Sequence, residues 1–342
     1  MKTYKKFVRT FILYFVLSLC FIMGLNFIVD PIGLYRMSFQ LQHVENKAYP
    51  EFVALKLYSK FDTAIIGTSR SQKIDHRYLN KYNINAKNLS LAASSIDINY
   101  ELAKKAKELN KDIILFLDPY TLSKTLNSQV KKKRDKLLIL KREINKLNDN
   151  SLYYYFKYLT STKTFSLSVS TLSYLLRQVP RDYKYLKENK TEAYIKGQAP
   201  KGVSKSVRYK NYIPDHKLIE ATTSLLTKDD NIIITPLVFE YYSELYKTGI
   251  LEIYFDVIQS ILDKNNTNVI SFLYPNKDLL DNNLFDNSGS HFKHFYSKKI
   301  IDDIYSKNKK ISILLTRDNF IDYKKQIILW LITQQKELNA LQ

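Results

Sequence analysis

The longest apolar stretch of the chain runs from Phe11 to Val29 and contains one strongly polar residue, Asn26. At 1.5 Å per residue, a helix over this stretch reaches across the roughly 30 Å hydrocarbon core of a bilayer. Basic residues cluster just before the stretch, and Asp30 follows it. Because basic flanks stay in the cytoplasm, we expect residues 1–30 to form a cytoplasmic tip and transmembrane anchor, and residues 31–342 to be extracytoplasmic.

A cleaved signal peptide is the main alternative for this stretch. Such a peptide has a shorter apolar core and a small-x-small cleavage site, whereas this stretch ends in large residues up to Val29. A lipoprotein signal requires a small residue before Cys20, and that residue is Leu19. We therefore expect an uncleaved, single-pass anchor in a bacterial inner or plasma membrane. The run Ile327–Ile332 is too short to span a membrane and predicts a buried terminal helix.

Short apolar runs recur along the exported part and predict buried strands. They lie at Thr63–Ile66, Asn88–Leu91, Asp112–Leu117, Asn231–Thr235 and Val269–Tyr274. Helical patterns separate them, at Glu51–Lys60, Asp97–Leu109, Leu218–Leu226, Val238–Lys264 with a break near Gly249, and Ser297–Lys307. This alternation predicts an α/β fold, with a three-layer parallel sheet that has helices on both faces. Ligands bind outside the carboxyl ends of the strands in such sheets.

The segment at about 120–215 breaks the alternation. It is basic and rich in tyrosine, and it has a helical pattern from Val130 to Leu147. We interpret it as an insertion in the exported domain that lies over the ligand-binding edge of the sheet. There it would act as a lid or as a partner-binding surface.

The net charge of +20 over 342 residues favours an anionic partner, such as nucleic acid, anionic lipid or an acidic glycan. No nucleic-acid-binding motif accompanies the basic residues, so we expect no nucleic-acid partner. The single cysteine, Cys20, excludes an intrachain disulfide and a cysteine metal site. His291, His294 and Asp286 are too few to predict a metal site, and no nucleotide-binding fingerprint indicates a cofactor.

Three features carry candidate chemistry. Ser69 follows the first predicted strand in a turn of small residues, where its hydroxyl can be a nucleophile and its N–H an oxyanion donor. A serine in this position more often caps a helix. His291 follows Asp286 in a Gly/Ser loop that suits a general base but is also typical of a plain surface loop. The small-residue turn Asn88–Ser94 can supply a second oxyanion N–H.

In their order along the chain, these features resemble the SGNH or GDSL-like hydrolases. The layout resembles most closely the single-pass, membrane-anchored members encoded with cell-surface polysaccharide genes. The matching segments are the anchor followed by Asp30-Pro31, then AIIGTSRS, LFLDPYTL, IIITPLVFEYY, LFDNSGSHF and ILLTRDNF. The resemblance implies an SGNH-like, flavodoxin-like sheet.

The resemblance also implies roles for individual residues. Ser69 would be the nucleophile, His291 the base, and Asp286 the acid that orients the imidazole. The family's acid lies three residues before the histidine, at the position of Ser288. Either the loop therefore bulges by two residues, or the acid is absent.

The oxyanion donors implied by the resemblance are the N–H groups of Ser69 and Ala93, the latter at a position where the family has glycine. The family's Gly-x-Asn-Asp block is replaced here by the segment that begins with Asp118, so its Asn donor is missing. Tyr120 or Thr121 would take the place of that donor. The family's Asp before the nucleophile is Thr68 in this chain.

Together these features imply a membrane-anchored acyltransferase or esterase, with acetyl as the expected acyl group and a cell-surface glycan as substrate. A polytopic membrane acyltransferase that delivers the acyl group would be its partner. The alternative is a catalytically degenerate module that binds glycan or an acyltransferase partner. The distance between Ser69 Oγ and a His291 nitrogen separates the two, because catalysis requires roughly 2.6–3.2 Å, or somewhat more without substrate.

We predict that a reporter fused after Tyr35 reaches the extracytoplasmic side, because the basic residues precede the apolar stretch. In bacterial cells, an alkaline phosphatase fusion at this point should be active and a green fluorescent protein fusion dark. The opposite pair of results would contradict the predicted orientation.

Overall fold

The computed structural model of the chain describes residues 2–34, 49–124, 131–149, 151–177, 212–286 and 291–340. Tyr35, Val130, Ser288 and residues 178–211 of the predicted insertion lie outside these ranges. The chain forms two compact units. We call Met1–Lys60 with Arg142–Lys184 the anchor unit, and Phe61–Lys141 with Tyr185–Gln342 the sheet unit.

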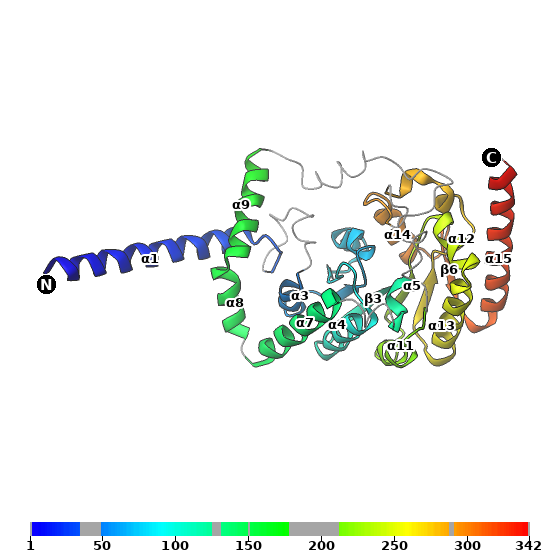
Figure 1. Cartoon of the computed structure of the whole chain (residues 1–342), viewed down its shortest axis with the longest axis horizontal. Coiled ribbons are helices and arrows are strands. Elements are labelled where there is room, and N and C mark those ends of the chain that lie inside the picture. The colour runs from blue at the N-terminus through cyan, green and yellow to red at the C-terminus, as the bar shows by residue number, and fades with distance from the viewer. Residues whose placement is uncertain are drawn as a thin grey trace. The chain divides into compact units, whose positions relative to one another are not determined.

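The apolar helix expected at the N-terminus is α1 (Lys2–Val29), drawn in blue in Figure 1. Its segment Tyr4–Val29 is long and apolar enough to cross a membrane, and 11% of its most apolar part is buried. A core helix of the same composition would be mostly buried. α1 therefore presents apolar side chains outward over most of its length.

Three further helices of the anchor unit are α3 (Pro50–Leu57), α8 (Ser151–Thr160) and α9 (Thr162–Leu176). α8 and α9 both pack against α1. Lys163 of α9 forms an ion pair with Glu51 of α3, with 2.6 Å between Nζ and Oε1. Part of the predicted insertion thus packs with the apolar helix, and its role as a lid over the sheet stays a prediction. α7 (Lys131–Asp149) contributes residues to both units.

Within the described residues, six strands form one sheet in the order β2-β1-β3-β4-β5-β6. They are β1 (Thr63–Ile66), β2 (Ala86–Asn88), β3 (Asp112–Leu117), β4 (Asn231–Ile234), β5 (Asn268–Ser271) and β6 (Ile313–Leu315). The first five pair in parallel, as the apolar runs predict. The mixed α/β fold and the mostly parallel sheet are therefore confirmed. β6, which the sequence did not predict, pairs antiparallel with β5.

The second strand is displaced from its predicted position, because β2 ends at Asn88. The chain nevertheless continues to follow β1 beyond that residue. Leu89 N donates to Ile65 O at 2.8 Å, and Leu91 N donates to Gly67 O at 3.1 Å. The turns after β1 and β2 are thereby kept next to each other at the carboxyl edge of the sheet.

Helices cover both faces of the sheet. On one face, α4 (Ile96–Glu108), α11 (His216–Thr223) and α13 (Ile250–Lys264) contact one another in series, and they lie side by side in Figure 1. On the other face, α14 (Tyr296–Tyr305) contacts the 3-10 helix η2 (His76–Tyr82). Connections between parallel strands are right-handed. The step from β1 to β2 runs along the sheet in the opposite direction to the steps from β2 to β3, β3 to β4 and β4 to β5. η2 therefore lies on the opposite face from α4, α11 and α13.

The remaining elements of the sheet unit are α5 (Pro119–Leu122), α12 (Phe239–Lys247), α15 (Arg317–Ala340), and the 3-10 helices η1 (Ser71–Lys73), η4 (Lys277–Leu280) and η5 (Asn282–Leu284). Gly249, with φ of 72°, separates α12 from α13 at the predicted break. α15 buries one face, including Ile327 and Leu331, while Leu329 is exposed. The predicted terminal helix is therefore buried on one side only.

We predict that Ile65→Asp unfolds the sheet unit, because Ile65 is fully buried in β1 and a lone buried carboxylate is costly. Circular dichroism during heating should show that the cooperative transition of this unit is lost. Leu314→Asp, at an exposed position of the edge strand β6, is the matched control and should cost less than about 1 kcal/mol. An unchanged transition in Ile65→Asp would show that the core has been wrongly placed.

Candidate active site

The turn after β1 brings the chain very close to β3 at Gly67. A Cβ at this position would lie 2.9 Å from Phe116 Cβ and would also clash with Ser71 Oγ. Glycine is therefore required for the chain to leave the sheet here. Ser69 follows two residues later and is half-buried, so that its hydroxyl can reach a ligand at the sheet edge. η1 begins at Ser71 with no side-chain cap, so Ser69 does not cap it.

One buried carboxylate, that of Asp118 after β3, holds this turn. Arg70 Nη1 lies 2.9 Å from Asp118 Oδ2, and Thr68 Oγ1 donates to the same oxygen at 2.8 Å. Asp118 is 1% exposed. A buried charge is tolerated only when it is paired and hydrogen-bonded. Asp118 therefore fixes both neighbours of Ser69, and Ser69 lies between them at the carboxyl edge of the sheet.

Asn88, at the end of β2, supports the same turn from the other side. Its side-chain amide donates to Ser71 O at 2.7 Å and to Ile74 O at 3.2 Å. Gln72 Nε2 donates to Ser90 O at 3.0 Å, which adds a second link to the turn after β2. The turn Asn88–Ser94 thus has a structural role in addition to the oxyanion role expected for it.

His291 meets Ser69 across this edge. His291 Nε2 lies 2.8 Å from Ser69 Oγ, which is within the hydrogen-bonding range. The other ring nitrogen, Nδ1, lies 3.4 Å from Asp286 Oδ2. The side chains of His291 and Asp286 are 27% and 24% exposed, so the group is open to solvent. The structure therefore brings together the three residues proposed as nucleophile, base and acid.

A short backbone pairing explains how Asp286 reaches His291 despite the unusual spacing. Phe285 and Phe292 form an antiparallel bridge, and both side chains are fully buried. Asp286 N donates to His291 O at 2.9 Å. The two residues therefore stand opposite each other across the bridge. The loop between them, residues 287–290, lies outside the described residues, so the bulge expected there stays a prediction.

Contacts behind the site hold the serine and histidine segments together. His294 Nδ1 lies 2.8 Å from Lys73 O, and Asp75 N donates to Ser297 Oγ at 3.4 Å. The chain after Ser69 is thereby joined to the chain after His291. His294 is buried and takes part in this link. In the described residues, no cluster of three or more His, Cys, Asp or Glu residues could hold a metal ion.

The oxyanion candidates other than Ser69 differ in their surroundings. Ala93 is exposed and has φ of 55°, a left-handed conformation that glycine adopts more readily. Thr121 is fully buried, and its hydroxyl donates to Asp118 O at 2.9 Å. Its hydroxyl therefore has a structural role in the turn after β3. Tyr120 is half-buried beside it.

Two buried tyrosines donate hydrogen bonds to backbone carbonyls at and just after the end of β3. Tyr254 OH donates to Leu117 O at 3.1 Å, and Tyr212 OH donates to Pro119 O at 2.7 Å. Burial raises the pKa of both hydroxyls well above the ordinary value, and the nearby Asp118 carboxylate raises the pKa of Tyr212 further. Both hydroxyls therefore stay protonated and act as hydrogen-bond donors to the strand ends.

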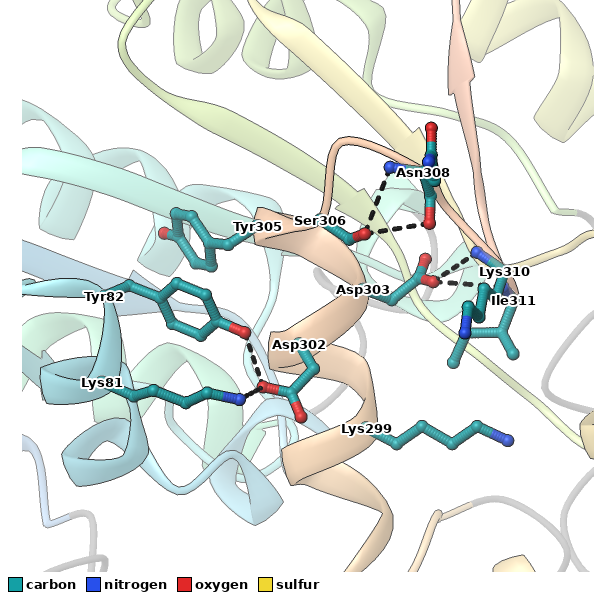
Figure 2. A pocket seen from close by; sticks show the side chains of 10 residues that line it. All are labelled: Lys81, Tyr82, Lys299, Asp302, Asp303, Tyr305, Ser306, Asn308, Lys310 and Ile311. Carbon is teal, nitrogen blue, oxygen red and sulfur yellow. Dashed lines mark hydrogen bonds and ion pairs between the residues drawn. The ribbon is translucent and has the colours of Figure 1, made fainter.

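A polar pocket of about 370 Å³ lies between η2 and α14 (Figure 2). Its lining includes neither Ser69 nor His291. Asp302 in its wall accepts hydrogen bonds from Lys81 Nζ at 2.8 Å and from Tyr82 OH at 2.6 Å. These bonds join η2, which follows the serine segment, to α14, which follows the histidine segment.

The sequence did not predict that Arg70 anchors the turn or that Asp118 is its partner. A signal was present, because a charged residue directly follows the candidate nucleophile and an acidic residue ends the neighbouring strand. Carboxyl ends of adjacent parallel strands meet at one edge, which makes such a pair plausible. Its burial depends on packing that a sequence pattern does not reveal.

We predict that Asp118→Ala destabilises the sheet unit by about 3–5 kcal/mol, because it leaves the buried Arg70 guanidinium without this partner. The double variant Asp118→Ala/Arg70→Leu should be more stable than Asp118→Ala alone. Asp322→Ala, which breaks an exposed pair with Lys325, is the control and should cost less than about 1 kcal/mol. Denaturant unfolding measures all three. Equal stability of Asp118→Ala and the control would contradict the role of Asp118 in holding the turn around Ser69.

No family model matches this chain, and no curated protein matches it either. A functional assignment therefore depends on the geometry of the site and on the sequence features described above.

Proposed function

We propose that this chain is a membrane-anchored, SGNH-like acyltransferase or esterase that acts on a cell-surface polysaccharide. The observation that carries the proposal is the 2.8 Å distance between Ser69 Oγ and His291 Nε2. It falls within the range expected of a nucleophile and its base. The two residues are 222 positions apart in the chain, and they meet at the sheet edge where ligands bind in parallel α/β folds.

The strand order supports the same proposal. The chain moves from β1 outward to β2 and then returns to place β3 on the other side of β1. This reversal is a topological switch point, where doubly wound sheets bind their ligands. Ser69 follows β1 and Asp118 follows β3, so the candidate nucleophile lies at the switch point. The first five strands follow the order 2-1-3-4-5 of flavodoxin-like sheets, which supports the proposal of an SGNH-like fold.

In the proposed reaction, Ser69 Oγ attacks the carbonyl carbon of an acyl donor while His291 Nε2 takes the hydroxyl proton. Asp286 holds the Nδ1–H of the resulting imidazolium. The N–H groups of Ser69 and Ala93 stabilise the oxyanion. The donor's leaving group departs with the proton from His291, and an acyl-Ser69 ester remains. A glycan hydroxyl or water then attacks this ester, with His291 again as the base, and Ser69 is regenerated.

The place of action follows from the N-terminus. α1 is long and apolar enough to anchor the chain, and basic residues precede it, which supports an extracytoplasmic sheet unit. A surface polysaccharide is the acyl acceptor available there, and a net charge of +20 favours an acidic one. A polytopic membrane acyltransferase would supply the acyl group, and acetyl is the expected group.

Two observations favour a second candidate, a catalytically degenerate module that binds glycan or the acyltransferase partner. The 3.4 Å between Asp286 Oδ2 and His291 Nδ1 is longer than a good hydrogen bond. Thr121, one of the two proposed substitutes for the missing Asn donor, is also buried and bonded within the fold. A protein that only binds its partner needs the intact fold, but it does not need good catalytic geometry.

We predict that Ser69→Ala and His291→Ala each abolish acylation of the surface polysaccharide, and that the double variant is no worse than either. Asp286→Asn should retain more activity than either, because its contact with His291 is long. The matched controls are Ser224→Ala and His216→Ala, both exposed and distant in sequence from the site, which should behave as wild type. The readout is the O-acyl content of the polysaccharide in cells with equal amounts of each variant. Wild-type acylation in Ser69→Ala would leave the binding module as the function.

A further inference from the structure

The one strongly polar residue of the apolar stretch, Asn26, is buried by the two helices that cross α1. Asn26 Nδ2 donates to Leu159 O in α8 at 2.6 Å, and Asn26 Oδ1 accepts from Ser168 Oγ in α9 at 2.8 Å. An amide buried without such bonds would be costly. The pairing therefore fixes where along α1 the two helices attach.

A second tie lies just beyond the end of α1. Asp30 Oδ1 accepts from Leu34 N at 2.8 Å and from Tyr158 OH at 3.0 Å. Tyr158 belongs to α8 and is 2% exposed. The attachment of α8 thus extends from Asn26 to the first residues after the helix.

These ties set the depth of α8 and α9 relative to a bilayer. Asn26 precedes Val29, the last residue of α1, by three residues, which is about 4.5 Å along the axis. When the stretch Phe11–Val29 fills the hydrocarbon core, the crossing point lies at its boundary with the headgroups. α8 and α9 run across α1 rather than along it (Figure 1), so they lie along the membrane surface.

Each of these helices carries an apolar stripe on its surface. On α8 the stripe comprises Leu152 and Phe156, which are 79% and 51% exposed. On α9 it comprises Phe165, Val169, Leu172 and Leu176, at the spacing of one helical face. The last three are exposed in the part of the chain that the structure describes, with Leu176 at 76%. A helix that faced only water would carry polar residues at these positions.

The charge of the same segment suits a lipid surface. Residues 151–177 include Lys157, Lys163 and Arg177 and no acidic residue. Amphipathic helices with basic and apolar faces lie in membrane interfaces, with the apolar face about 5–10 Å deep in the headgroup and acyl boundary. Anionic headgroups attract the basic side chains.

We propose that α8 and α9 form an interfacial platform in the bilayer, with the apolar stripe among the lipids at the surface from which residue 30 emerges. The inference rests on α1 as a membrane span. The platform adds a second attachment beside α1 and fixes the rotation and depth of that helix, which a single span would leave free.

The full-length chain offers a direct test because Cys20 is its only cysteine and lies exposed on α1. Labelled with an environment-sensitive nitrobenzoxadiazole dye, wild-type Cys20 reports on the span. In a Cys20→Ser background, Phe156→Cys and Leu172→Cys report on the stripe, and Ser166→Cys, exposed on another face of α9, is the matched control. Each protein is reconstituted into phosphatidylglycerol and phosphatidylethanolamine vesicles that contain lipids with a shallow or a deep nitroxide quencher.

The shallow quencher should reduce the emission at positions 156 and 172 at least about twofold more than at position 166, and aqueous iodide should do the reverse. Cys20 should respond most to the deep quencher. Iodide access at positions 156 and 172 equal to that at 166 would overturn the platform. Apolar emission there without nitroxide quenching would also overturn it, because protein would then cover the stripe. Cys20 without nitroxide quenching would overturn the span itself, and with it the platform.

Discussion

The geometry of the candidate site depends on the pairing of one buried carboxylate with the two residues that flank Ser69. Asp118 has no access to solvent that would stabilise its charge, so Arg70 and Thr68 must stay bonded to it. Because β1 and β3 are parallel neighbours, the ends of both strands lie at one edge, and the carboxylate can reach the turn. The serine hydroxyl is thereby held still while it remains open to a ligand. His291 reaches it through a separate bridge.

The fold was predictable where local pattern and burial agree. Fully buried parallel strands give short, continuous apolar runs, and β1 and β3 were found at their observed bounds for this reason. β6 was missed because its apolar run Ile313–Leu315 has three residues and is shorter than the runs of four to six residues that predicted the other strands. The order of elements also predicted that Ser69 and His291 meet, since residues at strand ends converge at one edge. The bridge that carries Asp286 to His291 could not be foreseen from spacing alone.

Buried polar residues mark the two places where the sequence was least informative. One is Asp118 at the edge of the sheet, and the other is Asn26 in α1. Asn26 stands out in its stretch, but its partners lie 133 and 142 residues away, and no pattern links them. The helices that hold it were interpreted as part of a lid over the sheet. Both helices pack against α1, and the role of the insertion as a lid or partner-binding surface stays a prediction. Both cases follow one rule, that a buried polar group is explained only when its partner is known.

The most direct test of the account is to trap the acyl-enzyme. The full-length chain in detergent micelles is mixed with p-nitrophenyl acetate, quenched in acid within the first turnover, and mapped by peptide mass spectrometry. The account predicts an acetyl group on Ser69, because His291 Nε2 is in position to accept its proton. Its amount should fall sharply in His291→Ala. Acetyl groups confined to exposed lysines, with Ser69 unmodified in the wild-type chain, would contradict the assignment of Ser69 as an activated nucleophile.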